Sequence, residues 1–133
     1  MSKSSTPKPT ESELNILQVL WTKGPSSVRA VNEILNETRE MGYTTTLKLM
    51  QIMTEKGLVI RDTSTRSHIY SANVSEDVTK NNLLNGFLEQ TFQGSAGNLV
   101  MQALGNHKTS PEELEKIKSL IKEIEKSNHG TNQ

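Results

Sequence analysis

The stretch that decides the fold spans residues 42–57 and reads GYTTTLKLMQIMTEKG. It predicts one helix, which Thr44 or Thr45 can cap because their hydroxyls accept hydrogen bonds from the free amides of the first turn. Gly57 supplies the left-handed residue with which many helices end. One face has the i, i+3, i+4, i+7 spacing of a helix that packs on a core. The residues of this face are Thr46, Leu49, Met50 and Met53.

The opposite face of this helix is polar apart from one leucine. Short polar, basic and amide side chains at a helix N-terminus suit hydrogen bonding to bases and phosphates. They also suit an ordinary solvated face, so the neighbouring segments have to decide between the two interpretations. The residues of this outward face are Thr44, Thr45, Leu47, Lys48 and Gln51.

Two helices precede this one. Thr10 and Glu13 have the Thr-x-x-Glu spacing of a capping box, which predicts the start of the first helix. Trp21 lies on its apolar stripe, and we interpret it as a core residue rather than a ligand-binding one. After a Lys-Gly-Pro break, Ser26 or Ser27 can cap the second helix. Three such helices with a short connection between the second and third predict a helix-turn-helix.

After Gly57 the pattern changes from helical to β-prone. Two short β-prone segments flank a polar turn at residues 62–66, which predicts a small hairpin. Arg66 lies at its tip, with Arg61 and His68 beside it. A hairpin directly after the third helix is the wing of a winged helix-turn-helix, and its basic tip is placed to reach a phosphate backbone or a minor groove.

The chain from residue 74 onward is helical again and predicts three amphipathic helices. They are too few to bury their apolar stripes alone, so we expect them to pack against their copies in a second chain. The alternative is that they fold back on the first domain. The predicted dimerisation residues are Leu84, Phe87, Leu88, Phe92, Leu99, Val100, Leu104, Leu114, Ile117, Leu120, Ile121 and Ile124.

The sequence thus predicts a mainly α fold with a small β-hairpin, in which a winged helix-turn-helix domain is followed by a helical dimerisation domain. We expect a disordered lead over residues 1–9 and a disordered tail over 128–133. Between them, residues 10–73 form the winged-helix DNA-binding domain and residues 74–127 form the three-helix dimerisation domain.

Composition narrows the function classes. The 133 residues include no cysteine, which excludes disulfides, thiolate metal sites and a cysteine nucleophile. No apolar run approaches membrane-spanning length and no signal peptide is recognisable, so we expect a cytoplasmic protein. The sequence also contains no phosphate-binding glycine loop, paired catalytic carboxylates or Ser/His/Asp arrangement, and its histidines are scattered. We therefore expect no enzyme, no metal site and no cofactor.

The order of the parts and several motifs are similar to those of a known family. Over roughly residues 10–126, the chain resembles the penicillinase-repressor family, which includes regulators of β-lactamase and methicillin resistance and copper-responsive repressors. The motifs that carry the resemblance are Glu11-x-Glu13-Leu14 with Leu20-Trp21, Ser27-Val28-x-x-Val31-Asn32-Glu33-Ile34, Tyr43-Thr44-Thr45-Thr46, Glu55-Lys56-Gly57-Leu58-Val59 and Tyr70.

This resemblance implies a sequence-specific transcriptional repressor that binds double-stranded DNA as a homodimer at a dyad-symmetric operator. The third helix would lie in the major groove, where Leu47 could meet a thymine methyl group. The predicted DNA-binding residues are Ser27, Arg29, Tyr43, Thr44, Thr45, Leu47, Lys48, Gln51, Arg61, Arg66 and His68.

The sequence departs from the family in two places. The copper-responsive branch carries a C-terminal cysteine cluster, which this chain lacks, so copper sensing is not expected. The β-lactamase branch is inactivated by cleavage of an Asn-Phe bond in the dimerisation domain, and the nearest match here is Gln102-Ala103. Cleavage in this region, triggered indirectly by a membrane sensor protease, is therefore a hypothesis.

A second function class remains open at this point. Residues 1–72 carry 9 Lys and Arg against 7 Asp and Glu, whereas residues 73–133 carry 6 against 8. The two parts therefore carry about +2 and −2, an asymmetry that is weak evidence for DNA binding. The net charge of zero argues against it and supports an alternative. The alternative is a winged-helix module that binds protein and not DNA. In either case, no small-molecule substrate is expected.

Overall fold

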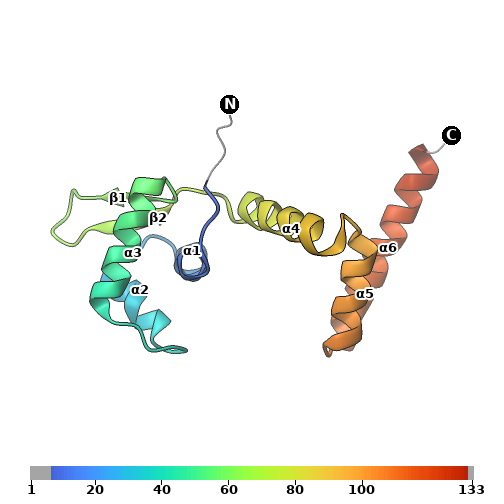
Figure 1. The fold of residues 1–133 in the computed structure, drawn as a ribbon, viewed down its shortest axis with the longest axis horizontal. Coiled ribbons are helices and arrows are strands. Elements are labelled where there is room, and N and C mark those ends of the chain that lie inside the picture. The colour runs from blue at the N-terminus through green and yellow to red at the C-terminus, as the bar shows by residue number, and fades with distance from the viewer. Residues whose placement is uncertain (1–6, 132–133) are drawn as a thin grey trace. The chain divides into compact units, whose positions relative to one another are not determined.

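The computed structural model describes residues 7–131 (Figure 1). None of the helices in this range is long and apolar enough to cross a membrane. The predicted fold class, mainly α with one small hairpin, is confirmed. In chain order the elements are α1 (Glu11–Lys23), α2 (Val28–Leu35), α3 (Tyr43–Lys56), β1 (Val59–Asp62), β2 (Ile69–Ala72), α4 (Glu76–Phe92), α5 (Ala96–Asn106) and α6 (Pro111–Thr131).

The chain divides into two compact units, the first running to Leu84 and the second beginning at Asn85. The first unit contains α1, α2, α3, the antiparallel hairpin of β1 and β2, and the start of α4. The division lies inside α4, later than the predicted boundary after residue 73.

The two predicted disordered ends have different outcomes. Residues 1–6 of the lead lie outside the described residues, and residues 7–9 form no helix or strand. At the other end, α6 continues to Thr131, beyond residue 127, where the three predicted helices were expected to end. Serine and asparagine lower helix propensity only modestly, and no proline follows that would stop the helix. Of the predicted tail over 128–133, only residues 132–133 lie outside the described chain.

The core of the first unit lies between α1, α2, α3 and the hairpin. α1 contacts α2, α3 and β2, and α2 contacts α3. Trp21 lies half-buried against this core, where its indole Nε1 donates to the Val74 carbonyl oxygen at 3.0 Å. The interpretation of Trp21 as a core residue is confirmed. The buried core residues are Ile16, Leu17, Val19, Leu20, Val28, Val31, Leu35, Met50, Met53, Leu58, Val59 and Tyr70.

The inward face of α3 is the one that its sequence predicts. Thr46, Met50 and Met53 are buried, and Leu49 is half-buried against the core. Gly57 ends the helix in the left-handed conformation, with φ of 85°. Periodicity alone was sufficient here, because the residues that share one side of a helix recur every three to four positions.

The start of α3 differs from the prediction. Gly42 is the N-cap residue, and because glycine has no side chain, it makes no side-chain hydrogen bond to the first turn. Thr44 and Thr45 already belong to the helix, which begins at Tyr43. A capping hydroxyl must come from the extended residue just before the helix, so the predicted capping by Thr44 or Thr45 is wrong.

An ion pair between buried Glu13 and half-buried Lys56 joins the start of α1 to the end of α3. The Glu13 side chain is 3% exposed and both of its oxygens accept from Lys56 Nζ at 2.9 Å. Glu13 also completes the predicted capping box, since its Oε1 accepts from the Thr10 amide at 2.9 Å. Burial opposes ionisation, but the hydrogen bonds from Lys56 and Thr10 outweigh it and lower the pKa of the Glu13 carboxyl.

We expect Glu13→Gln to lower the free energy of unfolding by about 2 kcal/mol at pH 7, because the Lys56 ammonium loses its carboxylate partner. A carboxyl whose pKa is lowered by folding stabilises the fold above its unfolded-state pKa, and the stabilisation disappears as the pH falls through the folded-state pKa. The difference between the unaltered protein and the variant should therefore shrink below about pH 4.3. Urea unfolding from pH 7 to pH 3 measures this difference, and a constant difference would contradict the assigned role.

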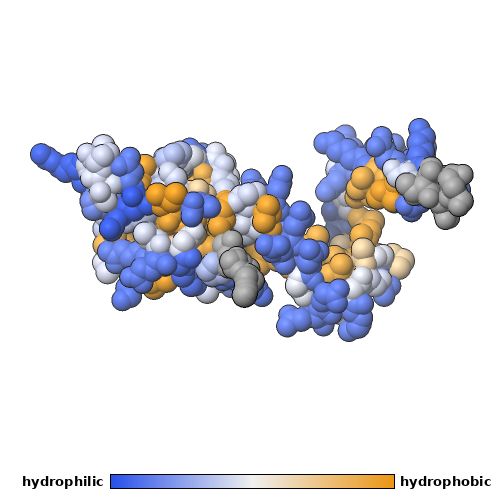
Figure 2. Space-filling model, turned by 90° about the horizontal axis from the view of Figure 1, so that it is seen from above, coloured by the Kyte–Doolittle hydropathy of each residue, from blue (hydrophilic) through white to orange (hydrophobic). Residues whose placement is uncertain are grey.

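The second unit forms no buried core among its described side chains. From residue 85 to residue 129, no described side chain is buried. Phe87 and Phe92 pack edge to face, with ring centroids 5.8 Å apart, yet half of Phe87 is still exposed. Apolar residues of this unit appear as orange patches among the hydrophilic ones in Figure 2. Those that are exposed include Phe87, Val100, Met101, Leu104, Leu114, Leu120, Ile121 and Ile124.

Candidate nucleic-acid interface

The outward face of α3 is open to solvent over most of its length. Thr44, Thr45, Lys48 and Gln51 are exposed, as predicted. Leu47 is an exception, because it is half-buried and packs against the core. The prediction that Leu47 faces fully outward is therefore corrected.

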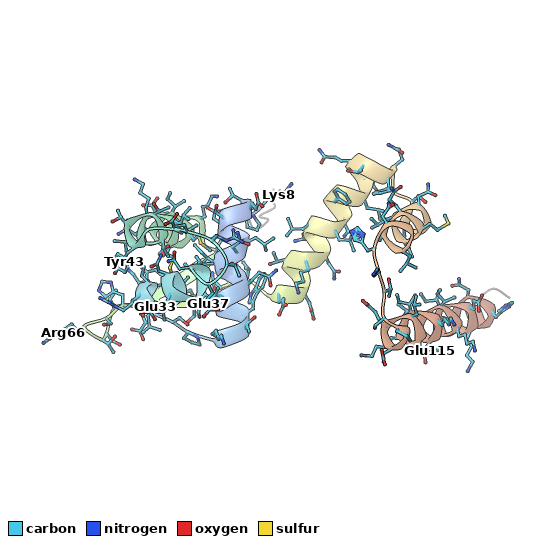
Figure 3. All side chains as sticks on the ribbon, turned by 90° about the horizontal axis from the view of Figure 1, so that it is seen from below. Lys8, Glu33, Glu37, Tyr43, Arg66 and Glu115 are labelled. Carbon is cyan, nitrogen blue, oxygen red and sulfur yellow. The ribbon has the colours of Figure 1, made fainter. Side chains whose placement is uncertain are left out.

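A hollow of about 360 Å³ lies beside this face, where α2, α3 and the loop end of the hairpin meet. Figure 3 shows Tyr43 on α3 and Arg66 extending from the hairpin. The structure brings together six of the predicted DNA-binding residues here, which are Ser27, Arg29, Tyr43, Leu47, Arg66 and His68.

Three further residues line the hollow and were not predicted. Ser67 lies between Arg66 and His68, so its place in the hairpin loop could have indicated it. Val28 and Tyr70 are buried members of the core, so their burial, and not a DNA-binding role, explains their place here.

Backbone pairing explains why the hairpin lies beside the start of α2. The Ser26 amide donates to the Tyr70 carbonyl oxygen at 3.0 Å, and the Tyr70 amide donates back to the Ser26 carbonyl oxygen at 2.8 Å. The next residue, Ser27, caps α2 by accepting from the Ala30 amide at 3.1 Å. The strand end and the helix start are thus held together by paired backbone groups, so the hollow is part of the folded framework.

The hollow favours anions. Arg29 and Arg66 contribute two guanidinium groups, and no carboxylate is among its lining residues. The N-terminus of α2 also contributes positive potential, and its first turn contains no acidic residue. At the end of β1, Asp62 accepts from the Ser64 amide at 2.9 Å, and this hydrogen bond lowers the pKa of the Asp62 carboxyl.

The other predicted residues lie along α3 and β1. Gln51 and Arg61 line a smaller hollow of about 260 Å³, which also contains Glu55 and Thr54. Glu55 offsets the charge of Arg61, so this hollow is less favourable for an anion than the first one. Thr44, Thr45 and Lys48 lie on the exposed surface of α3 outside both hollows.

Comparisons with known proteins add a family relationship. A family model described as penicillinase repressor matches residues 9–123. The chain is 21% identical over 117 residues to a penicillinase repressor of Bacillus licheniformis, which covers 88% of this chain and 91% of that protein. It is 33% identical over 60 residues to the transcriptional regulator BlaI of Mycobacterium tuberculosis, covering 44% of each protein.

A solved structure is also similar to this chain. It is the solution structure of the Bacillus licheniformis BlaI monomeric form in complex with the blaP half-operator. The alignment has a TM-score of 0.49 and 20% sequence identity, and covers 55% of this chain and 89% of that chain.

Proposed function

The chain belongs to the penicillinase repressor family, and from this membership we propose how it binds its operator. It is a DNA-binding transcriptional repressor. In the proposed complex, two copies of the chain bind a dyad-symmetric operator, and each places α3 in the major groove of one half-site. The spacing of the half-sites then follows from the two-fold symmetry of the dimer.

The hollow formed by α2, α3 and the hairpin is the observation that carries this proposal. An α-helix with its side chains is about as wide as the major groove, so α3 can enter it with its exposed face toward the base edges. Thr44, Thr45 and Gln51 supply hydrogen-bonding groups on that face, while Lys48 and Arg66 supply charge for phosphates. The lining residues of the hollow then face the sugar-phosphate backbone beside the groove.

The net charge of zero does not oppose this arrangement, because the charges are separated on the surface. Glu33 lies in the second half of α2 and Glu37 lies just after its end (Figure 3), and neither residue lines the hollow. The cationic hollow can therefore attract phosphates while acidic residues elsewhere balance the total charge. Local potential, rather than net charge, controls the encounter with DNA at short range.

Dimerisation is the second part of the proposal. The apolar residues of the second unit stay exposed among the described residues even where they touch one another, as Phe87 and Phe92 do, and burying them stabilises by about 25 cal/mol per Å². A second copy presents the same stripes, which suits a symmetric interface in which each patch meets its equivalent. This supports assigning the predicted dimerisation residues to contacts between two chains.

Salt-dependent DNA binding tests the proposal. We expect the full-length protein to select a preferred duplex from a random pool, and to lose affinity for it steeply as salt rises. Fluorescence anisotropy across a salt series measures the slope. Failure to bind any duplex in a salt-sensitive way would overturn the proposal in favour of a winged-helix module that binds protein.

Lys48→Ala and Arg66→Ala should each weaken binding to all sequences alike and reduce the salt slope by about 1, because each removes one phosphate contact. Both side chains are exposed, so thermal unfolding should not change. Lys8→Ala is the matched control, since Lys8 is an exposed cation far from Arg66 in Figure 3. A variant at either site that keeps its DNA affinity but unfolds earlier would refute the assignment of that residue.

Release from DNA by proteolysis stays a prediction. The Gln102–Ala103 bond lies within α5, and both residues are exposed. Cleavage there requires α5 to unfold locally, because a helical backbone keeps its amides and carbonyls in its own hydrogen bonds. Incubation with a cognate sensor protease and mass measurement of the products tests it, and an intact chain would remove the idea.

A further inference from the structure

The helix α3 begins differently from the other helices. Within the described chain, the other five begin with a Ser or Thr hydroxyl that accepts from an amide of the first turn. These hydroxyls belong to Thr10, Ser27, Ser75, Ser95 and Ser110. α3 instead begins after Gly42, which has no side chain to hold its first turn. Another group must therefore fix the start of the helix that carries the DNA-reading face.

Two asparagines supply that restraint: Asn32 lies in α2, and Asn36 is the residue that follows its last turn. Asn36 pairs with both backbone groups of Met41: its Nδ2 donates to the Met41 carbonyl oxygen at 2.9 Å, and its Oδ1 accepts from the Met41 amide at 3.0 Å. The same Nδ2 donates to the Asn32 carbonyl oxygen at 2.8 Å. This side chain thus uses both of its amide protons and its oxygen, which fixes its orientation.

Asn32 adds a second connection to the same place. Its Nδ2 donates to the Met41 carbonyl oxygen at 2.9 Å and to Thr46 Oγ1 at 2.8 Å. Thr46 is fully buried on the inward face of α3, and its hydroxyl also lies 3.3 Å from the Gly42 carbonyl oxygen. The two asparagines therefore hold the residues on both sides of Gly42, and we call this arrangement the asparagine clasp.

We propose that Asn32 and Asn36 are positioning residues for sequence recognition. This inference rests on the proposed function of α3 as the recognition helix. Met41 lies two residues before Tyr43, so its position sets the direction in which the first turn of α3 leaves the connection. That turn carries Thr44 and Thr45, whose base contacts require placement to within about half an ångström. The clasp therefore controls discrimination between DNA sequences. It contributes little to the electrostatic attraction between the protein and the DNA phosphates.

Asn36→Ala in the full-length protein tests the clasp. The variant should bind the duplex selected by the unaltered protein about tenfold more weakly, the effect of loosening one good base contact. Its affinity for a scrambled duplex and its salt slope should not change, because no cationic group is removed. A purely structural defect would lower the folded fraction and so weaken binding to both duplexes equally. The ratio of the two affinities therefore separates positioning from folding.

Asn73→Ala is the matched control, because it removes the same kind of contact from the other end of α3. Asn73 is also exposed, and its Nδ2 donates to the Gly57 carbonyl oxygen at 3.0 Å. This variant should keep the affinity ratio of the unaltered protein. Amide hydrogen exchange without DNA gives an independent measurement. Asn36→Ala should speed exchange at residues 41–46 and not at 52–57, and Asn73→Ala should do the reverse.

Two results would overturn the inference. One is that the ratio of affinities for the selected and scrambled duplexes in Asn36→Ala stays within about twofold of the ratio in the unaltered protein. A change that small is less than the effect of a single lost base contact. The other is unchanged hydrogen exchange at residues 41–46. If the unaltered protein itself shows no sequence preference, the proposed function fails instead, and the exchange experiment still decides whether the clasp holds α3.

Discussion

Leu120→Glu combined with Ile124→Glu should abolish dimerisation and weaken operator binding by about a hundredfold or more. The two side chains are 59% and 49% exposed, and they lie four residues apart on the same face of α6. Placing two carboxylates on the predicted dimer interface opposes association, both through lost apolar burial and through repulsion across a symmetric contact. Without the dimer, each half-site is bound independently, and linked binding is typically worth a factor of about 10² to 10⁴.

Lys122→Glu provides the control for charge. It also changes the net charge by two units in the negative direction, but Lys122 lies on roughly the opposite side of α6 from Leu120 and Ile124. This variant should stay dimeric. Sedimentation equilibrium measures the oligomeric state, and anisotropy with the selected duplex measures the affinity. A double variant that is still a dimer, or a monomer that binds the whole operator as tightly as before, would contradict the assignment of α6.

Much of the first unit could be predicted because its signals are local. The capping box of Thr10 and Glu13 and the left-handed Gly57 each depend on residues that are close together in the chain. The start of α3 could not be predicted in the same way. Threonine and glycine are about equally good N-cap residues, so the sequence alone does not choose between Gly42 and the threonines after it. In the structure, the residue before Gly42 pairs with Asn36, and this pairing depends on how the connection folds back on α2.

The candidate interface also depends on contacts between residues far apart in the sequence, which the sequence alone does not reveal. Hydrophobic periodicity and the basic hairpin pointed to the individual side chains, but their meeting around one hollow depends on the backbone pairing of Ser26 with Tyr70. Those two residues are far apart in the sequence, and neither type carries a signal for such a bridge. Leu47 illustrates the consequence, because a position that is outward by helical spacing becomes half-buried once α3 packs on the core.

Met50→Ala should lower the free energy of unfolding by about 2–5 kcal/mol, the usual cost of truncating a large core side chain. Met50 is fully buried on the inward face of α3. The loss combines the transfer free energy of the removed atoms with the cavity that is left behind. Urea unfolding at a fixed protein concentration measures the change. Under conditions in which the variant is folded, its affinity for the selected duplex should match that of the unaltered protein, because Met50 does not reach the DNA-facing surface.

Gln51→Ala, at the next residue, should have the opposite effects: it should weaken DNA recognition and leave stability nearly unchanged. Gln51 is exposed and predicted to read a base edge, so its loss should relax specificity at one base pair by about 1–3 kcal/mol. Stability should stay within about 0.5 kcal/mol, since alanine is a good helix former and no buried contact is lost. Adjacent residues of a helix point about 100° apart, so this pair tests the division of α3 into a core face and a DNA face. Reduced DNA affinity in folded Met50→Ala, or a large stability loss in Gln51→Ala, would show that the two faces are wrongly assigned.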